Sequence, residues 1–341
     1  MELQKQESKQ DMIPKVDFEE LLEHIGGWGK FQIRLTAIFV YFTFFLAYVG
    51  YTPILYLYTP DHWCKIPENV QEELNISDQN ALLNLMIPTD NGKRSQCQMF
   101  NYTDFKEGKQ PRRIQCIHGY EYNYTEYFKS ATSQFDWVCQ DEWKPAFTQS
   151  MFYAGAIIGT LIFGYVSDHF GRFWSFMISN MVIMVTGLAT PFAFDFVSFT
   201  ILRFLMGLGF NTFFMALYML ALEYVDKKKR ALVGNLALAI AMSFGGCIQP
   251  WILYGVGDWR WFHHILFGQT ILIFGAPYFV KESSRWLITK GKIDEAIEVM
   301  LEIAKENGKT VNQAMVQSFK VSLILFLVSF ASILTFPKKI R

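Results

Sequence analysis

Polar and charged side chains inside long apolar runs are the residues of this sequence that could do chemistry. One run carries Arg203, Gly207, Asn211, Phe214 and Tyr218 at spacings of 4, 4, 3 and 4, which keep them within roughly 80° of arc on a helix that turns about 100° per residue. For the glycines alone, a packing face is the preferred interpretation. A guanidinium in an apolar run is expensive and normally faces a wet cavity or a partner. Arg203 therefore predicts a functional face.

Two neighbouring runs add amides and phenols. Gln149 and Tyr153 lie in the run at 146–166, and Gln249 lies in the run at 231–254. An amide or phenol with aromatic neighbours suits a ligand that has both apolar and charged parts. We therefore predict that these three residues line a cavity with Asn211 and Tyr218. No Asp or Glu lies in the middle of these runs, so a cationic ligand would be held here by aromatic faces, and any carboxylate would come from outside this part of the fold.

A second set of charges recurs where the apolar runs end. The string GYVSDHFGRFW contains glycines that permit close helix approach and a tight reversal, and it places opposite charges four residues apart. Further charges follow two later runs. We interpret the set as an ion-pair cluster that must break for helices to separate, which is a gate; the alternative is an ordinary solvated loop. Its predicted members are Gly164, Asp168, Gly171, Arg172, Glu223, Arg230, Glu282 and Arg285.

The segment 60–145 concentrates chemistry of another kind. It holds four of the five cysteines and the three Asn-x-Ser/Thr glycosylation acceptors. The residues are Cys64, Cys97, Cys116 and Cys139, and Asn75, Asn101 and Asn123. Both modifications require an oxidising, glycosylating compartment, so we expect an extracellular loop with disulfides. Four cysteines allow three connectivities, among which the sequence does not choose, and one pair could also stay free.

The elements that must position these residues are membrane helices. The chain has 341 residues, of which 51% are hydrophobic and 18% are charged, and its mean hydropathy is +0.16, which is too apolar for an ordinary soluble domain. A net charge of zero excludes a generally basic nucleic-acid binder. A span needs about 20 apolar residues. Six runs qualify: 31–52, 146–166, 173–194, 197–220, 231–254 and 261–280.

Orientation follows from the basic residues of the short loops. Lys and Arg collect before the first span, between the second and third, between the fourth and fifth, and after the sixth. We therefore predict a cytoplasmic N-terminus, and we find no cleavable signal peptide. The predicted parts are a cytoplasmic segment 1–30, a first transmembrane helix 31–59, the glycosylated loop 60–145, helices two to six at 146–280, a cytoplasmic helical linker 281–320, and a partial seventh helix and tail 321–341.

Two further segments have simple interpretations. Residues 292–307 have the apolar period of an amphipathic helix that stops at Gly308. The run 321–336 is short and ends in a basic tail, so an interfacial helix and a span are both open. His263 and His264 are adjacent, which points their rings about 100° apart and argues against a metal pair. We predict that both anchor the helix at the interface, beside tryptophans.

Several strings in chain order resemble one family. GYVSDHFGRFW resembles the signature of the major facilitator superfamily. DFEELLEHIGGWGKFQ, PDHWC, FDWVCQDEW, LEYVDKKKR, DWRW and ESSRWL resemble the organic ion transporters within it, which include organic cation and carnitine carriers. The resemblance covers about residues 15–290. It implies an all-α membrane protein: a six-helix N-terminal bundle with a large extracellular loop, the C-terminal bundle of such transporters being missing.

The resemblance also implies roles and shows departures. It implies that the fourth helix lines the substrate path, with an aromatic at Tyr218, that the 292–307 helix packs against the bundle, and that two bundles rock to give alternating access. His169 and Phe173 stand where the family usually has basic residues, and both prolines of its string around residues 281–285 are absent. These departures weaken the inferred gate more than the inferred fold.

The predicted function is plasma-membrane transport of small organic ions, either organic cations or carnitine-like zwitterions. The alternative is a truncated half-transporter that binds ligand or a full-length partner without transporting. The sequence lacks a phosphate-binding loop, a His-Glu-x-x-His motif and a Gly-x-Ser-x-Gly motif, so we predict no enzyme activity, no cofactor and no metal. The expected partners are the substrate, the lipid bilayer and a second bundle in a dimer, but no nucleic acid.

Overall fold

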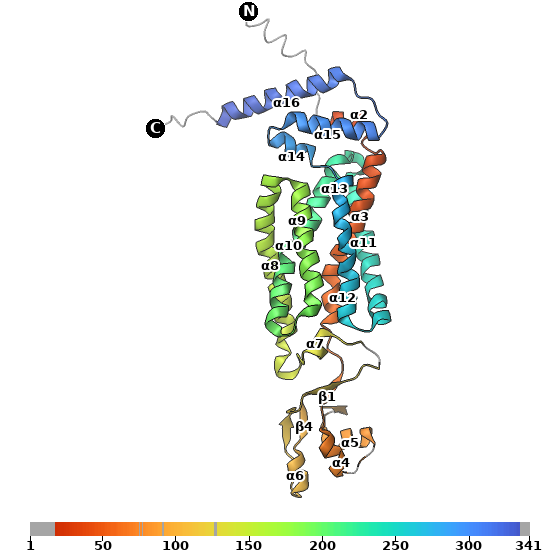
Figure 1. Ribbon diagram of the computed structural model, residues 1–341, viewed down its shortest axis with the longest axis vertical. Helices are drawn as coiled ribbons and strands as arrows, with labels where there is room; N and C mark the ends of the chain where they lie inside the picture. The colour runs from red at the N-terminus through yellow and green to blue at the C-terminus, as the bar shows by residue number, and fades with distance from the viewer. Residues whose placement is uncertain (1–17, 75, 77, 91, 126–127, 335–341) are drawn as a thin grey trace, which may run out of the picture.

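The structure, a computed structural model, is a bundle of long helices with a small loop region at one end and short helices at the other (Figure 1). It describes residues 18–74, 76, 78–90, 92–125 and 128–334, with backbone alone for 326–334. Asn75 and the segment 1–17 of the predicted cytoplasmic tail lie outside the described residues. The long helices are α3 (Lys30–Tyr56), α8 (Trp143–Phe170), α9 (Arg172–Ala189), α10 (Phe196–Tyr224) and α11 (Lys227–Val256).

The remaining elements are short, apart from two helices near the C-terminus. The helices are α2 (Phe18–His24), α4 (Glu68–Leu74), α5 (Gln79–Met86), α6 (Tyr102–Lys106), α7 (Ala131–Gln134), α12 (Trp259–Gly268), α13 (Ala276–Phe279), α14 (Ser284–Thr289), α15 (Ile293–Glu306) and α16 (Gln313–Leu334). The 3-10 helices are η1 (Cys139–Asp141), η2 (Thr190–Phe192) and η3 (Gln269–Gly275). The strands are β1 (His62–Cys64), β2 (Thr89–Asp90), β3 (Lys93–Arg94), β4 (Gln98–Phe100), β5 (Arg113–Gln115) and β6 (Tyr120–Tyr122).

Five described helices are long and apolar enough to cross a membrane, and they correspond to the first five predicted spans, although the third helix ends at Phe192, two residues before the predicted end. The sixth predicted span, 261–280, is helical but not a single α-helix, so whether it crosses a membrane stays a prediction. The structure divides it into α12, η3 and α13. Gly268 and Gly275 weaken an α-helix, and Pro277 lacks the amide that would donate to the preceding turn.

Glycines allow α8 and α10 to cross in backbone contact. Gly155 and Gly159 on α8 form a Gly-x-x-x-Gly pair, and Gly207 lies opposite on α10. A Cβ built on Gly159 would lie 1.9 Å from the Leu208 carbonyl oxygen, and one on Gly207 would lie 2.1 Å from that of Phe152. A side chain at either position would therefore force the helices apart. α10 also packs on α9 and α3, while α11 packs on α3.

The loop region between α3 and α8 has its own small core. Its strands form three antiparallel pairs, β1 with β6, β2 with β3, and β4 with β5. Residues His62 and Tyr122 are paired in the first, and Gln98 and Gln115 in the third. The buried residues of this core are Cys64, Val70, Leu82, Leu83, Met86, Ile87 and Met99. The region lies at the end of the bundle opposite α14, α15 and α16 (Figure 1).

The amphipathic helix expected at 292–307 is α15. Its buried side is formed by Ile293, Ala296, Ile297, Met300, Ile303 and Ala304. Leu301 is 41% exposed, whereas Ile303 faces the bundle. α16 contains the run 321–334 and lies across the end of the bundle rather than along it (Figure 1). Whether it crosses a membrane stays a prediction, and residues 335–341 are outside the described chain.

Candidate functional site

Arg203 lies inside the bundle and is 1% exposed. Its guanidinium donates to the Gln149 side-chain oxygen on α8 and lies 3.7 Å from the Met206 sulfur. The guanidinium carbon lies 4.5 Å from the ring centre of Phe152 and 5.8 Å from that of Tyr56. Within the described residues no carboxylate pairs with Arg203, and its Nε has no hydrogen-bond partner. A neutral amide and aromatic faces therefore hold a positive charge that can still attract an anionic group.

Three residues that the sequence interpretation did not assign to this site complete it. We define the arginine site as Arg203, Gln149, Phe152, Tyr56 and His263. The rings of Tyr56 and His263 meet edge to face, with their centres 4.7 Å apart. The Tyr56 hydroxyl and His263 Nδ1, like Arg203 Nε, are buried without a partner. Three unpartnered polar atoms belong to neighbouring side chains, and such groups favour a water or a polar ligand.

His263 also corrects an expectation. It is 1% exposed and packs against Tyr56 and Phe267, so its predicted role as an interfacial anchor is wrong. Adjacent helical residues point in different directions, and His264 instead contacts Phe192 and Trp261. The available signal for Tyr56 was an aromatic residue at the end of an apolar run, which is too common to single it out.

The rest of the predicted α10 stripe divides between two neighbouring helices. The Asn211 amide donates to Thr160 Oγ1 on α8 at 3.2 Å, and Asn211 is exposed. Phe214 and Tyr218 both contact Phe39 on α3, with ring centres 5.9 and 5.8 Å apart. A pocket of about 180 Å³ opens beside Asn211 and Thr160 and extends to Arg172. The stripe therefore connects the arginine site with the charged end of the bundle.

The other predicted path residues differ in exposure. Tyr153 is 53% exposed. Gln249 is fully buried: its oxygen accepts from Thr52 Oγ1 at 2.9 Å, and its nitrogen donates to the Ala47 carbonyl at 3.1 Å. Those bonds join α11 to α3, so in this conformation Gln249 fixes helix packing rather than facing open space. Next to it, Tyr51 and Met242 line a groove of about 350 Å³ on the same two helices.

Glu282 is the centre of the charged end. Its carboxylate accepts from the backbone nitrogens of Arg172 at 3.0 Å, Phe173 at 3.2 Å and Ser283 at 2.8 Å. The first two are free amides at the N-terminus of α9, where the helix dipole favours an anion. Gly171, at φ 106°, makes the turn, and a Cβ there would lie 2.1 Å from Glu282 Oε2. Burial raises the pKa of Glu282, against the lowering effect of these amides.

Ion pairs continue the cluster toward α10. Arg172 Nε lies 3.7 Å from Glu223 Oε1, and its terminal nitrogen lies 4.0 Å from Asp168 Oδ1. Glu223 also accepts from the Ser283 hydroxyl. The Asp168 side chain is 79% exposed, so Asp168 contributes mainly through its carbonyl, which accepts from Trp286 Nε1 at 3.0 Å.

Glu19 on α2 pairs with the two remaining arginines of the predicted gate. It accepts from Arg230 at 3.2 Å and pairs with Arg285, whose guanidinium also lies 4.6 Å from the Phe18 ring centre. The sequence interpretation quoted the α2 string but missed Glu19, because an acid in a short polar helix carries no distinguishing signal. We call Arg172, Glu223, Glu282, Glu19, Arg230 and Arg285 the charge cluster. Of the predicted gate glycines, Gly171 lies against Glu282 of this cluster, while a Cβ built on Gly164 would have no neighbour within 4 Å.

Asn307, also missed, fastens α15 to the start of α3. Its oxygen accepts from the Phe31 nitrogen at 3.0 Å. Its amide donates to the carbonyls of Ile25 at 3.0 Å and Gly26 at 3.1 Å, and to Gln32 Oε1 at 3.0 Å. One asparagine at the end of α15 therefore satisfies the turn between α2 and α3.

In the loop region the four cysteines form two disulfides. Cys64 bonds to Cys116, and Cys97 bonds to Cys139. Asn101 and Asn123 form side-chain turns, their oxygens accepting from the nitrogens two residues ahead at 3.1 and 3.0 Å. Cys247 is free and exposed on α11.

Comparisons with known proteins agree with this arrangement. The model of the family described as "Sugar (and other) transporter" matches residues 114–323. Bovine solute carrier family 22 member 7 is 30% identical over 312 residues, which are 87% of this chain and 56% of that protein. Rat organic cation/carnitine transporter 2 is 28% identical over 313 residues, which are 86% of this chain and 54% of that protein. The chain thus spans about half the length of these relatives.

A solved structure shows the fold. The xylose transporter XylE from E. coli, in a partially occluded inward-open conformation, aligns with a TM-score of 0.51 at 17% identity over 87% of this chain and 60% of that chain. The matches are transporters, which confirms the prediction that the chain is not an enzyme. The chain therefore belongs to the sugar (and other) transporter family, and within the major facilitator superfamily its resemblance to the organic cation/carnitine transporters is confirmed.

Proposed function

We propose that this chain is the N-terminal bundle of a multi-pass plasma-membrane transporter that moves small organic ions, organic cations or carnitine-like zwitterions, by alternating access. The observation that carries the proposal is Arg203, a buried guanidinium held by Gln149 and aromatic rings within a bundle of apolar helices. Buried charges in such helices mark ligand or ion paths. The names of the relatives, a solute carrier and an organic cation/carnitine transporter, support the substrate class.

In this proposal the loop region faces outward and the charge cluster faces the cytoplasm. The two disulfides support an oxidising surrounding for the loop. Asn101 and Asn123 would carry glycans, as would Asn75. The basic residues that begin α11 support a cytoplasmic position for the opposite end.

The path would run between α3, α8, α10 and α11, from the arginine site along Asn211, Phe214 and Tyr218. Aromatic faces would hold the apolar and cationic parts of a substrate, and Arg203 would attract a carboxylate where one is present. The charge cluster would keep the cytoplasmic side closed. To open it, Arg172 and Glu223 must separate, and Glu282 must leave the α9 amides or move with them.

A second candidate is a bundle that binds an organic ion or a full-length partner without transport. It is favoured by the match to only 54–56% of the two relatives, because rocking requires two bundles. A dimer of this chain would supply a second one.

Uptake measurements separate these candidates. Cells expressing the chain are supplied with a labelled organic cation and, separately, with a labelled carnitine-like zwitterion. Uptake above control of either, reduced at least tenfold by Arg203→Met and unchanged by the exposed control Arg113→Met, supports transport. No uptake from a chain glycosylated at the cell surface leaves the binding candidate, which predicts a ligand-induced rise in the melting temperature of the purified chain.

The topology has its own test. Asn101→Gln and Asn123→Gln should each remove one deglycosylation-sensitive step in electrophoretic mobility. Unmodified asparagines that a cytosolic protease can reach would contradict the proposed orientation, and the transport proposal with it.

A further inference from the structure

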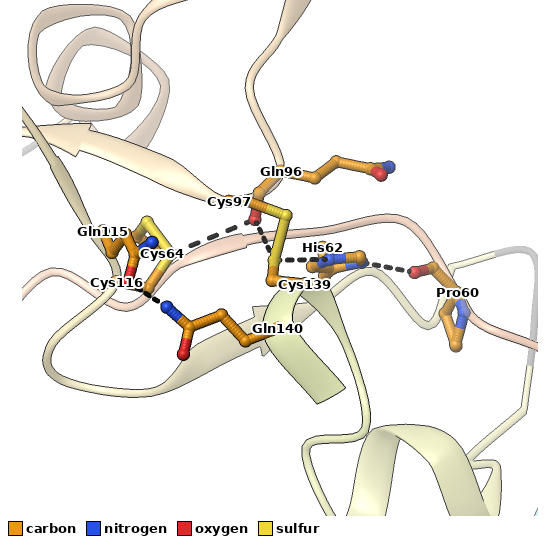
Figure 2. The surroundings of a disulfide bond; sticks show 9 residues. All are labelled: Pro60, His62, Cys64, Gln96, Cys97, Gln115, Cys116, Cys139 and Gln140. Carbon is orange, nitrogen blue, oxygen red and sulfur yellow. Dashed lines mark hydrogen bonds between the residues drawn. A yellow bond between two sulfur atoms is a disulfide. The ribbon is translucent and has the colours of Figure 1, made fainter. Parts of the chain in front are cut away.

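A histidine faces one of the two loop disulfides. His62 Nε2 lies 3.9 Å from the sulfur of Cys139, which is bonded to Cys97 (Figure 2). The donor atoms of these three residues all lie within 4.8 Å of one another, and within the described chain they are the one group of His, Cys, Asp or Glu with such spacing. Imidazole and cysteine sulfur are the usual ligands of zinc.

The orientation of His62 is fixed. Its Nδ1 lies 3.0 Å from the Pro60 carbonyl oxygen (Figure 2). Because a carbonyl can only accept, Nδ1 is the donor, which leaves Nε2, the nitrogen that faces the sulfur, as the one that can bind a metal. The side chain is buried between Tyr120 and Tyr122, whose ring centres lie 5.8 and 5.7 Å away. A metal-binding histidine typically has this arrangement, with its second nitrogen donating to a carbonyl.

The separation of His62 Nε2 from the Cys139 sulfur is close to that of two ligands in a tetrahedral metal site. Bond lengths of about 2.3 Å to sulfur and about 2.0 Å to nitrogen place a nitrogen and a sulfur ligand about 3.6 Å apart, and two sulfur ligands about 3.8 Å apart. The observed distance from nitrogen to the nearer sulfur is 3.9 Å. The oxidised pair cannot bind a metal as thiolates, so the geometry becomes available only when the bond between the sulfurs is broken.

We propose that reduction of the Cys97–Cys139 disulfide creates a binding site for a divalent cation of the zinc class, with His62, Cys97 and Cys139 as ligands. A dithiol reductant supplies two electrons and two protons: its own disulfide forms, the Cys97–Cys139 bond breaks, and two thiols result. The cation then displaces both thiol protons to solvent and binds two thiolates and Nε2. Water takes the fourth position.

The other disulfide lies outside this site. Cys64 is fully buried, and no histidine is grouped with the Cys64–Cys116 pair among the described residues. The bridges are neighbours, since the Gln96 carbonyl oxygen lies 3.6 Å from the Cys139 sulfur and 3.9 Å from the Cys116 sulfur (Figure 2). Cys139 begins η1, the short helix that leads into α8, and Cys97 precedes β4. A bound cation would therefore keep the loop tied to the start of α8 after the covalent link is lost.

Cobalt binding to the full chain in detergent tests the proposal. A phosphine reductant opens the disulfides without adding thiols that compete for metal, and Co²⁺ reports thiolate ligands through charge-transfer absorption. One Co²⁺ per chain is expected after reduction and none before it, with displacement by Zn²⁺. His62→Ala should weaken binding at least tenfold, whereas His118→Ala, at an exposed histidine of the same loop, should leave it unchanged.

Alkylation followed by mass spectrometry identifies the ligands in the unaltered chain. Zn²⁺ should protect Cys97 and Cys139 of the reduced protein. Protection of Cys64 and Cys116 instead, equal binding by the oxidised chain, no binding by the reduced chain, or full affinity in a folded His62→Ala variant would each overturn the proposal. If the His62→Ala variant does not fold, the alkylation pattern of the unaltered chain decides the test, because it needs no substitution.

Discussion

The arginine site and the charge cluster satisfy buried charge in opposite ways. Arg203 has an amide, a thioether and aromatic rings around it, but no described carboxylate. Glu282 and Arg172, by contrast, have several partners each, including the α9 amides and Glu223. The first region carries an uncompensated charge, and the second is a closed network. A ligand can therefore add a stabilising contact at the arginine site, whereas a conformational change must break existing contacts in the charge cluster.

The comparison also separates removing a charge from breaking a pair. When a removed charge had no charged partner, no opposite charge is left behind. When one member of a buried ion pair is removed, the other member stays buried without compensation. The same substitution should therefore change the free energy of unfolding by different amounts in the two regions.

The largest effect is expected for Asn307→Ala, at the end where the charge cluster lies. It removes four hydrogen bonds and leaves backbone groups of Ile25, Gly26 and Phe31 without partners. We expect the free energy of unfolding to fall by about 3 kcal/mol, measured by denaturation in detergent, with faster proteolysis near α15. Asn312→Ala, which removes one exposed side-chain cap on Ala314, should change stability by less than about 1 kcal/mol.

Glu282→Ala should be next, because it removes the carboxylate that caps α9. A loss of about 2 kcal/mol in unfolding free energy is expected from a buried, charge-assisted cap. The matched control is Glu302→Ala, which breaks an exposed pair with Lys281 and should change stability by about 0.5 kcal/mol or less. Equal losses from both variants would show that the capping geometry does not stabilise the fold.

The same substitution, arginine to methionine, should change the free energy of unfolding differently at positions 172 and 203. Arg172→Met leaves the buried Glu223 carboxylate without the cation beside it, so we expect a loss of about 1 kcal/mol. Arg203→Met removes a buried charge with no described carboxylate partner, so stability should stay the same or rise by about 1 kcal/mol. Thermal unfolding of both variants in one detergent tests this. A larger loss at Arg203 would show that its amide and aromatic contacts dominate.

The smallest effect concerns pH in the loop region, where Arg112 holds the pKa of Asp104 at about 2 through side-chain hydrogen bonds of 2.9 and 3.0 Å. This pKa lies below the usual 3.8, so the stabilisation is complete above pH 3.8 and disappears as pH falls toward 2. Asp104→Asn should remove that dependence, which Trp63 fluorescence would follow. A wild-type profile identical to that of the variant would contradict it.

Glu282 should show the opposite sign. Because burial raises its pKa above 4.5, the folded state holds the proton more tightly than the unfolded state. Its contribution to stability therefore declines as pH rises from 4.5 toward the raised pKa. Glu282→Gln should remove this decline from the unfolding profile.

The long helices could be predicted from the sequence, because about 20 consecutive apolar residues have few alternatives to a membrane helix. The first five runs and the amphipathic α15 show this. The sixth run is helical but not one α-helix, since Gly268, Gly275 and Pro277 alter local backbone geometry within an apolar composition. Hydropathy measures transfer to lipid and does not report the hydrogen-bonding pattern within a segment.

The site was less predictable. Arg203 was found because a charge in an apolar run is conspicuous, but Tyr56, His263, Glu19 and Asn307 were not, because their residue types are ordinary at their positions. Gln249 was predicted to line a cavity, but in this structure it is buried, and its bonds to Thr52 and Ala47 depend on how two helices distant in sequence meet.

The sequence by itself determined the class of protein, the five long apolar helices, the family and the pool of cysteines and charges, since these follow from composition, order and spacing along one chain. The tertiary structure alone decided which cysteines pair, that Glu282 caps α9, and that Arg203 lies beside Tyr56 and His263. Those contacts join segments separated by tens to hundreds of residues, and their distances and angles are set by helix packing, which local sequence patterns do not specify.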